Sequence, residues 1–137
     1  FPDVPASSAY YAAITDLAAQ RVIGGYANGN FGPDDKVTRQ QFAKMIVLAM
    51  GLTVTGNEIC PFTDVPAQSG TDPFYPSKYV AVCAAQGITT GKTPTTYTVD
   101  PTAGSYVYDT QGKLRLFLKH GAGAEPIAQD LRQLLKG

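Results

Sequence analysis

The sequence is poor in the residues from which most catalytic and metal sites are built. Its 137 residues include one histidine, two cysteines and no tryptophan. His120 cannot complete a zinc site with Cys60 and Cys83, which are too far apart for a CxxC motif. One histidine also gives no Ser/His/Asp or Cys/His set. We therefore expect no enzyme, no metal site and no cofactor.

Net charge and long apolar runs are also lacking. The 11 basic and 11 acidic residues give a formal net charge of zero, and no apolar run approaches the roughly 18 residues needed to span a bilayer. We therefore expect neither nucleic-acid binding nor membrane insertion. The chain begins with Phe1 rather than Met, which indicates that it has been cut and leaves export open.

The two cysteines leave two interpretations open. In an exported protein we expect Cys60 and Cys83 to form a structural disulfide, which would stabilise the fold by about 3 kcal/mol through the unfolded state. The alternative is a pair of buried free thiols, because cysteine also packs as a small apolar side chain.

The chain contains an internal repeat. The recurring strings are FPDVPA at 1–6 with FTDVPA at 62–67, and AAQRVIGG at 18–25 with AAQGITTG at 84–91. With a short insertion in the second copy, this register places Phe31 over Tyr97. Each copy predicts an Asp-Val-Pro turn followed by a helix, which should end near Gly24-Gly25 in the first copy and near Gln86 in the second.

A second helix is predicted to begin at Thr38. Thr38 and Gln41 form the capping-box pattern Thr-x-x-Gln, in which each side chain satisfies an orphaned backbone N–H group. Phe42 and Ile46 belong to the core-facing stripe of this helix, and Gly51 is a natural left-handed terminator.

These residues resemble the S-layer homology (SLH) family over Phe1–Leu52. The resemblance implies non-covalent binding of cell-wall polymers, often pyruvylated polysaccharides, by repeats that typically combine in threes into a pseudo-threefold helical unit. The wall-contacting motif of the family is Thr-Arg-Ala-Glu or close to it, and here it reads Thr38-Arg39-Gln40-Gln41.

We expect a ligand-binding group at the start of this helix. A helix N-terminus and the guanidinium of Arg39 suit an anionic ligand. The predicted site residues are Arg39, Thr38, Lys36, Gln41 and Tyr26. The alternative is that Thr38 and Gln41 only cap the helix and that Arg39 is a solvated side chain.

The second repeat breaks down after its first helix. From Tyr97 to Gly137 the chain resembles the C-terminal end of the Sco/SenC copper chaperones, on the strings VDPTA, YVYD and QGKLRL and on the helix IAQDLRQLL. Pro101 stands where that family has its copper-ligating histidine, and the Cys-x-x-x-Cys motif is absent. We therefore expect the scaffold of that family without its copper chemistry.

The expected fold is mainly α with a small β-hairpin (α+β). Residues 1–56 form the first repeat, 57–96 a partial second repeat, and 97–137 a hairpin and helix that complete one composite domain. The expected function is a secreted, non-catalytic module that binds cell-wall polysaccharide at the cell surface. The first alternative is a fused or engineered chimera without a ligand, and the second is a Sco-like protein that has lost its ligands. An unpaired hairpin edge also makes a homodimer plausible.

Overall fold

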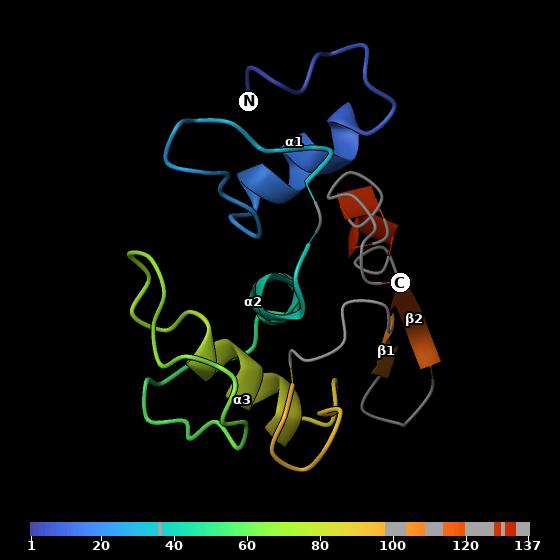
Figure 1. The fold of residues 1–137 in the computed structure, drawn as a ribbon. Coiled ribbons are helices and arrows are strands. Elements are labelled where there is room, and N and C mark those ends of the chain that lie inside the picture. The colour runs from blue at the N-terminus through green and yellow to red at the C-terminus, as the bar shows by residue number, and fades with distance from the viewer. Residues whose placement is uncertain (36, 98–103, 109–113, 120–127, 130, 134–137) are drawn as a thin grey trace.

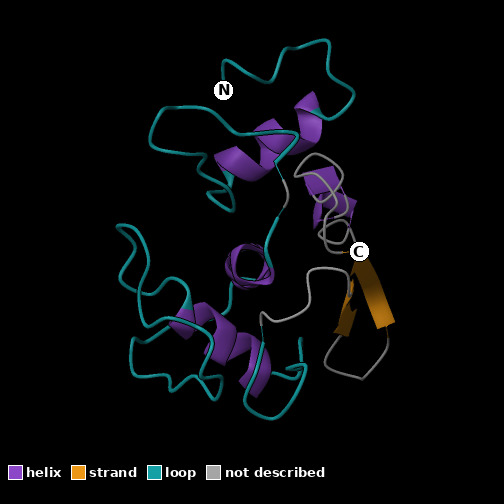
Figure 2. Cartoon of the chain, in the orientation of Figure 1, coloured by secondary structure: helices purple, strands orange, loops and turns teal. Residues whose placement is uncertain are grey.

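The described residues form three helices, one pair of strands and a short helical stretch near the C-terminus. In the computed structural model, the described residues are 1–35, 37–97, 104–108, 114–119, 128–129 and 131–133. Their elements are α1 (Tyr11–Ala19), α2 (Arg39–Ala49), α3 (Ser77–Ala85), β1 (Gly104–Tyr108) and β2 (Leu114–Lys119). Residues 128–129 and 131–133 are also helical. Long loops link the three helices (Figures 1 and 2).

The strands form a two-stranded antiparallel sheet. Their register pairs Gly104 with Lys119 and Tyr106 with Phe117, and it shifts between Val107 and Tyr108. Residues 109–113, between the two strands, lie outside the described residues.

All three helices end in the same type of C-terminal cap. At the end of α1 the N–H of Val22 donates to the Leu17 carbonyl at 2.9 Å, and Arg21 has a positive φ of 60°. At the end of α3 Ile88 donates in the same way to Cys83, with Gly87 at a φ of 69°. This is the hydrogen-bond pattern of a Schellman motif. The motif explains why α1 ends at Ala19, before the glycine pair at which the sequence places its end.

The internal repeat is visible in matching contacts. Asp3 accepts hydrogen bonds from the N–H groups of Phe31 at 2.9 Å and Gly32 at 2.8 Å. In the second copy Asp64 accepts from the N–H of Tyr97 at 2.8 and 3.0 Å. Aromatic pairs repeat as well, since Phe1 lies 5.5 Å from Phe31 and Phe62 lies 5.1 Å from Tyr97 between ring centroids.

The core lies where α1, α2 and α3 meet. Ile14 and Leu17 of α1, Ile46 and Val47 of α2, and Val80 of α3 have no exposed side-chain surface. Burying such side chains is the main favourable contribution to folding, at about 1.5–3 kcal/mol each. Met50, four residues after Ile46, is the C-cap of α2 and is 39% exposed.

The described part of the C-terminal helix joins this core. Ala128 and Leu131 are completely buried, and the Arg132 Nη2 atom lies 2.8 Å from a carboxylate oxygen of Asp16 on α1. Figure 1 shows this segment beside α1. Three apolar residues of the predicted helix IAQDLRQLL, Ile127, Leu134 and Leu135, lie outside the described residues.

Cys60 and Cys83 are free thiols, so the expected disulfide is not present in the structure. Each sulfur faces a different backbone carbonyl: Cys83 Sγ lies 3.6 Å from the Ala43 oxygen, and Cys60 Sγ lies 3.9 Å from the Phe62 oxygen. Burial raises the pKa of Cys83 to about 12. The alternative of free thiols therefore describes this structure, with Cys83 acting as a core side chain between α2 and α3.

Two carboxylates that accept backbone N–H groups make the stability sensitive to acid. The N–H of Phe31 lowers the pKa of Asp3, and the N–H of Thr55 lowers the pKa of Glu58 to about 2. Because the folded values lie below the unfolded ones, this stabilisation is present above about pH 4.5 and is lost as the pH falls toward about 2. We expect the thermal unfolding midpoint to fall steeply in that window.

The control for this prediction is a variant that cannot titrate. Glu58→Gln should show a shallower fall of the midpoint with pH than the parent, whereas the exposed Asp34→Asn should follow the parent. Differential scanning calorimetry in a pH series measures both. Equal slopes for Glu58→Gln and the parent would contradict the assignment.

Candidate functional site

A cavity opens between the two repeats, on the face of α2 that is turned away from the core. Its volume is about 380 Å³. The loop after α1, the middle of α2 and the loop before α3 enclose it. The lining residues are Val22, Ile23, Gly24, Gly25, Tyr26, Ala27, Phe31, Val37, Gln41, Lys44, Met45, Ser69, Gly70, Thr71, Asp72 and Tyr75.

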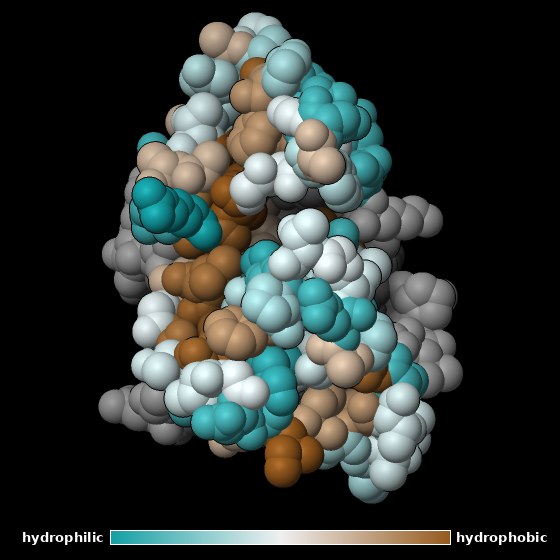
Figure 3. All heavy atoms as spheres, turned by 90° about the vertical axis from the view of Figure 1, so that its left-hand side faces the viewer, coloured by the Kyte–Doolittle hydropathy of each residue, from teal (hydrophilic) through white to brown (hydrophobic). Residues whose placement is uncertain are grey.

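The surface around the two loops mixes apolar and polar residues. Both loops lie on the left of Figure 1, and Figure 3 shows that side, with a band of hydrophobic residues flanked by hydrophilic ones. Within the cavity, Val22, Ile23 and Met45 provide apolar lining, and Tyr26 and Tyr75 provide aromatic rings. Pockets that combine apolar walls with a few convergent polar groups are the usual form of small-molecule sites.

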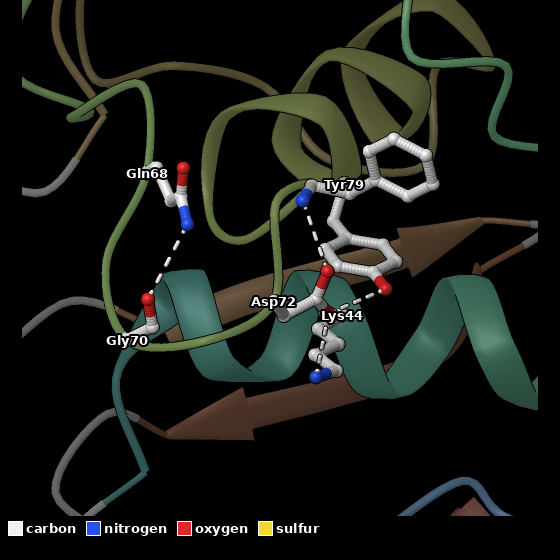
Figure 4. A network of polar contacts seen from close by, with 6 residues as sticks. Lys44, Gln68, Gly70, Asp72 and Tyr79 are labelled. Atoms are coloured by element: carbon white, nitrogen blue, oxygen red, sulfur yellow. Dashed lines mark hydrogen bonds and ion pairs between the residues drawn. The ribbon is translucent and has the colours of Figure 1, made fainter.

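A polar network forms one wall of the cavity (Figure 4). Lys44 Nζ lies 2.8 Å from Asp72 Oδ2, and the Tyr79 hydroxyl donates to the same oxygen at 2.8 Å. The N–H of Phe74 donates to Asp72 Oδ1 at 2.9 Å. Lys44 also lies over the rings of Tyr75 and Tyr79, with its Nζ 5.7 and 5.6 Å from their centroids.

This network fixes the charge state of Asp72. Burial would raise its pKa, but the hydrogen bonds from Lys44, Phe74 and Tyr79 together lower it below the ordinary value. Burial is the largest cause that raises the pKa of Tyr79, and the hydrogen bond to Asp72 raises it further. At neutral pH the group is thus a carboxylate held by one ammonium, one neutral phenol and one backbone N–H.

Tyr26 and Gln41 line the cavity from the first repeat. Tyr26 is 46% exposed. The burial of part of its side chain and the Asp35 carboxylate raise its pKa, whereas the hydrogen bond with Gln41 lowers it by less. Burial likewise raises the pKa of Tyr75, and the Thr38 hydroxyl acts in the other direction. Both phenols are therefore neutral at physiological pH and can donate or accept hydrogen bonds.

Thr38 and Gln41 form the capping box that the sequence predicts. The N–H of Gln41 donates to Thr38 Oγ1 at 3.1 Å, and the N–H of Thr38 donates to Gln41 Oε1 at 2.9 Å. Gln41 Oε1 is thereby engaged in the cap, and Gln41 is also one of the residues that line the cavity. Gln41 thus both caps α2 and lines the cavity, whereas Thr38 is a capping residue.

The structure places Arg39 away from the cavity and inside the protein, with only 8% of its surface exposed. Its Nη1 donates to the Tyr97 carbonyl at 2.6 Å, and its Nη2 donates to the Thr90 carbonyl at 2.7 Å. Its Cζ atom lies 4.0 Å from the centroid of the Tyr97 ring. Burial lowers the pKa of Arg39, although a guanidinium starts so high that it stays charged.

This position differs from the solvent-facing one that the sequence suggests for Arg39. The side chain joins the first repeat to the second, on the face of α2 that carries Phe42 and Ile46. Helical geometry places Gln41 and Lys44 on the other side of α2, since successive residues are about 100° apart. Lys36 lies outside the described residues.

Three lining residues of the cavity, Lys44, Asp72 and Tyr75, were not predicted from the sequence, and neither was Tyr79, which bonds to Asp72. Lys44 follows Gln41 by three residues, and this spacing places both on one helix face. Asp72 and Tyr75 lie in the part of the second copy that contains its insertion. The internal repeat therefore gives no signal for them.

No group of three or more histidine, cysteine, aspartate or glutamate residues with metal-site geometry occurs in the part of the chain that the structure describes. Nor does any helix among those residues have the length and apolarity to cross a membrane.

Comparison with known proteins supports the first of the two resemblances. The family model for the S-layer homology domain matches residues 1–43. An endoglucanase of Bacillus sp. (strain KSM-635) is 34% identical over 93 residues, which are 68% of this chain and 9% of that protein. This similarity thus covers more of the chain than the domain match. Neither comparison supports the resemblance of 97–137 to Sco/SenC proteins. Residues 1–43 therefore match the S-layer homology domain, and this match supports association of the protein with the cell surface or cell wall.

Proposed function

We propose that this chain is a non-catalytic module that holds cell-wall polysaccharide without a covalent bond, at the cavity between its two repeats. The observation that carries the proposal is the position of the cavity. It is bounded by the matched domain at 1–43 and by the loop before α3. The expected setting is an exported protein at the cell surface.

The lining suits a sugar polymer better than a compact hydrophobic ligand. Tyr26 and Tyr75 offer flat aromatic surfaces, and their hydroxyl groups offer hydrogen bonds beside those surfaces. Gln41 and the backbone of Gly24 and Gly70 add further polar groups. A polysaccharide ring presents apolar C–H faces and polar edges, which such a surface can match.

The similarity to an endoglucanase gives no reason to propose catalysis by this chain. The chain spans 9% of that protein's length. Glycoside hydrolysis typically uses a pair of carboxylic acids, and among the described lining residues of the cavity Asp72 is the one carboxylic acid. Binding rather than turnover is the proposed activity.

Retention of purified cell-wall polysaccharide tests the proposal. Tyr26→Ala is expected to weaken retention about tenfold, because an exposed aromatic contact at the rim is worth about 1.4 kcal/mol. Tyr11→Ala is the matched control, since Tyr11 is 39% exposed on α1 and does not line the cavity. A pulldown or surface plasmon resonance titration measures both. Absent binding by the parent, or equal loss in both variants, would contradict the proposal.

The alternative, a chimera that folds but has no ligand, predicts that the parent itself fails this assay. Self-association through a free edge of the β1–β2 sheet stays a separate prediction. Size-exclusion chromatography with light scattering checks it, and a monomer at high concentration would contradict it.

A further inference from the structure

The loop before α3, residues 67–76, is closed by its own hydrogen bonds. At its base the Ser77 hydroxyl donates to the Ala67 carbonyl at 2.8 Å, and inside it the N–H of Ser69 donates to the Tyr75 carbonyl at 2.8 Å. Compact surface loops whose ends lie close together keep their shape through such internal contacts. These bonds fix the shape of the loop, so its position against α2 depends on contacts with other elements.

Two contacts of the loop with other elements meet at Asp72 (Figure 4). Lys44 of α2 places its Nζ 2.8 Å from Asp72 Oδ2, and the hydroxyl of Tyr79 on α3 donates to the same oxygen at 2.8 Å. Lys44 Nζ also lies 5.7 Å from the centroid of the Tyr75 ring, which belongs to the loop. The Thr38 hydroxyl adds a contact to the Tyr75 phenol at the N-cap of α2. One carboxylate therefore joins the loop to both α2 and α3.

The same loop supplies one side of the cavity. It contributes Ser69, Gly70, Thr71, Asp72 and Tyr75 to the lining, and the other lining residues all lie within 22–45. From this arrangement we propose that Asp72 is a positioning residue for the ligand: through Lys44 and Tyr79 it holds the loop in the place at which the cavity is formed. This role is independent of the charge that the polysaccharide carries. The inference rests on the proposed function of the same site.

The exposure of the ion pair predicts that affinity changes more than stability does. The side chains of Lys44 and Asp72 are 35% and 24% exposed, and a pair at the surface contributes little to the free energy of unfolding. Residues 66–71 are exposed as well, so the loop can shift while the core between the three helices stays packed. A ligand would then have to order the loop again, and that ordering lowers its affinity.

A double-mutant cycle with purified cell-wall polysaccharide tests the proposal. The variants of the full chain are Asp72→Asn, Lys44→Met and the two combined, and isothermal titration calorimetry well below their melting temperatures measures Kd. Asp72→Asn keeps an acceptor for the Phe74 N–H but loses the charge that holds Lys44. Each single substitution is expected to raise Kd about tenfold, and the combination no further, because the two residues act as one unit.

Two results of this cycle would overturn the proposal. If Lys44 contacts the ligand directly, the double variant should bind more weakly than Asp72→Asn by about tenfold or more. If Asp72 contributes to stability alone, Asp72→Asn should have a lower melting temperature and an unchanged Kd.

Tyr79→Phe tests the position of the loop without changing a lining residue. Tyr79 is 6% exposed and is not among the described lining residues, so its hydroxyl acts on the ligand through Asp72 rather than by contact. Kd should rise about threefold. Tyr10→Phe is the matched control, since it removes a hydroxyl from a partly buried tyrosine outside the cavity, and it should bind like the parent. Equal Kd values for Tyr79→Phe and the parent would contradict the proposal.

Hydrogen exchange of the free protein separates this inference from the proposed function. In Asp72→Asn and in Tyr79→Phe the N–H groups of the loop should exchange faster than in the parent, because a loop held less firmly opens more often, whereas α1 should be unchanged. Unchanged exchange of the loop in both variants would overturn the inference and leave the proposed function intact. No binding of the polysaccharide by the parent would overturn both.

Discussion

Replacing Arg39 with alanine is expected to lower the free energy of unfolding by about 3 kcal/mol, and with it the melting temperature by roughly 10 °C. The variant loses two charge-assisted hydrogen bonds, to the carbonyls of Tyr97 and Thr90, and the contact of the guanidinium with the Tyr97 ring. The Tyr97 carbonyl would then be left in a buried environment with one donor fewer. Chemical denaturation monitored by circular dichroism measures the difference.

Two further variants separate charge from geometry at this position. Arg39→Lys keeps the charge but lacks the planar fork that reaches two carbonyls, so it should recover only part of the loss. Gln40→Ala, at the next position of α2, should change the free energy of unfolding by less than about 0.5 kcal/mol. A stable Arg39→Ala protein that no longer retains the wall polymer would show instead that Arg39 contacts the ligand.

Replacing Leu131 with alanine should be about as costly, at roughly 3 kcal/mol, because it removes a large side chain from a site with no exposed surface. The described helical residues near the C-terminus touch the rest of the protein through Leu131, Ala128 and the Arg132–Asp16 ion pair. That ion pair lies at the surface and contributes little. The apolar contact of Leu131 and Ala128 with the core therefore provides most of the stabilisation of this helical segment.

Limited proteolysis gives an independent measurement of this contact. In Leu131→Ala, cleavage in the C-terminal segment should become faster than in the parent, since local opening exposes the backbone. Gln133→Ala, at an exposed position of the same helix, is the matched control. If Leu131→Ala unfolds and is cleaved like the parent, the C-terminal helix does not share the core, and the composite domain would be wrong.

Local patterns predicted those features that depend on neighbouring residues alone. The Thr38–Gln41 capping box, the termination of α2 at Gly51 and the end of α3 to within one residue all follow from short spacings. The repeat register also predicted that Phe31 and Tyr97 are equivalent. In the structure the N–H of each donates a hydrogen bond to the aspartate at the start of its own copy. The end of α1 was misplaced because Arg21 takes a conformation that glycine usually supplies.

The site depends on packing between repeats, which single-sequence patterns do not encode. A helical arginine next to a cap reads as solvent-exposed until the following repeat supplies carbonyls for it, as Thr90 and Tyr97 do. Asp72 and Tyr75 belong to a stretch that the first copy lacks. Their role becomes visible only when the loop before α3 lies against Lys44.

The aspartate at the start of each copy has a consequence for how such chains are built. Asp3 accepts hydrogen bonds from the backbone of Phe31 and Gly32, and Asp64 accepts one from the backbone of Tyr97. In each copy, the segment at its start is therefore bonded to the loop after its first helix. These hydrogen bonds fix the shape of each copy from within that copy. The closing hydrogen bonds of each copy thus come from residues within that copy, up to Tyr97 in the second, and need no residue of the segment that follows.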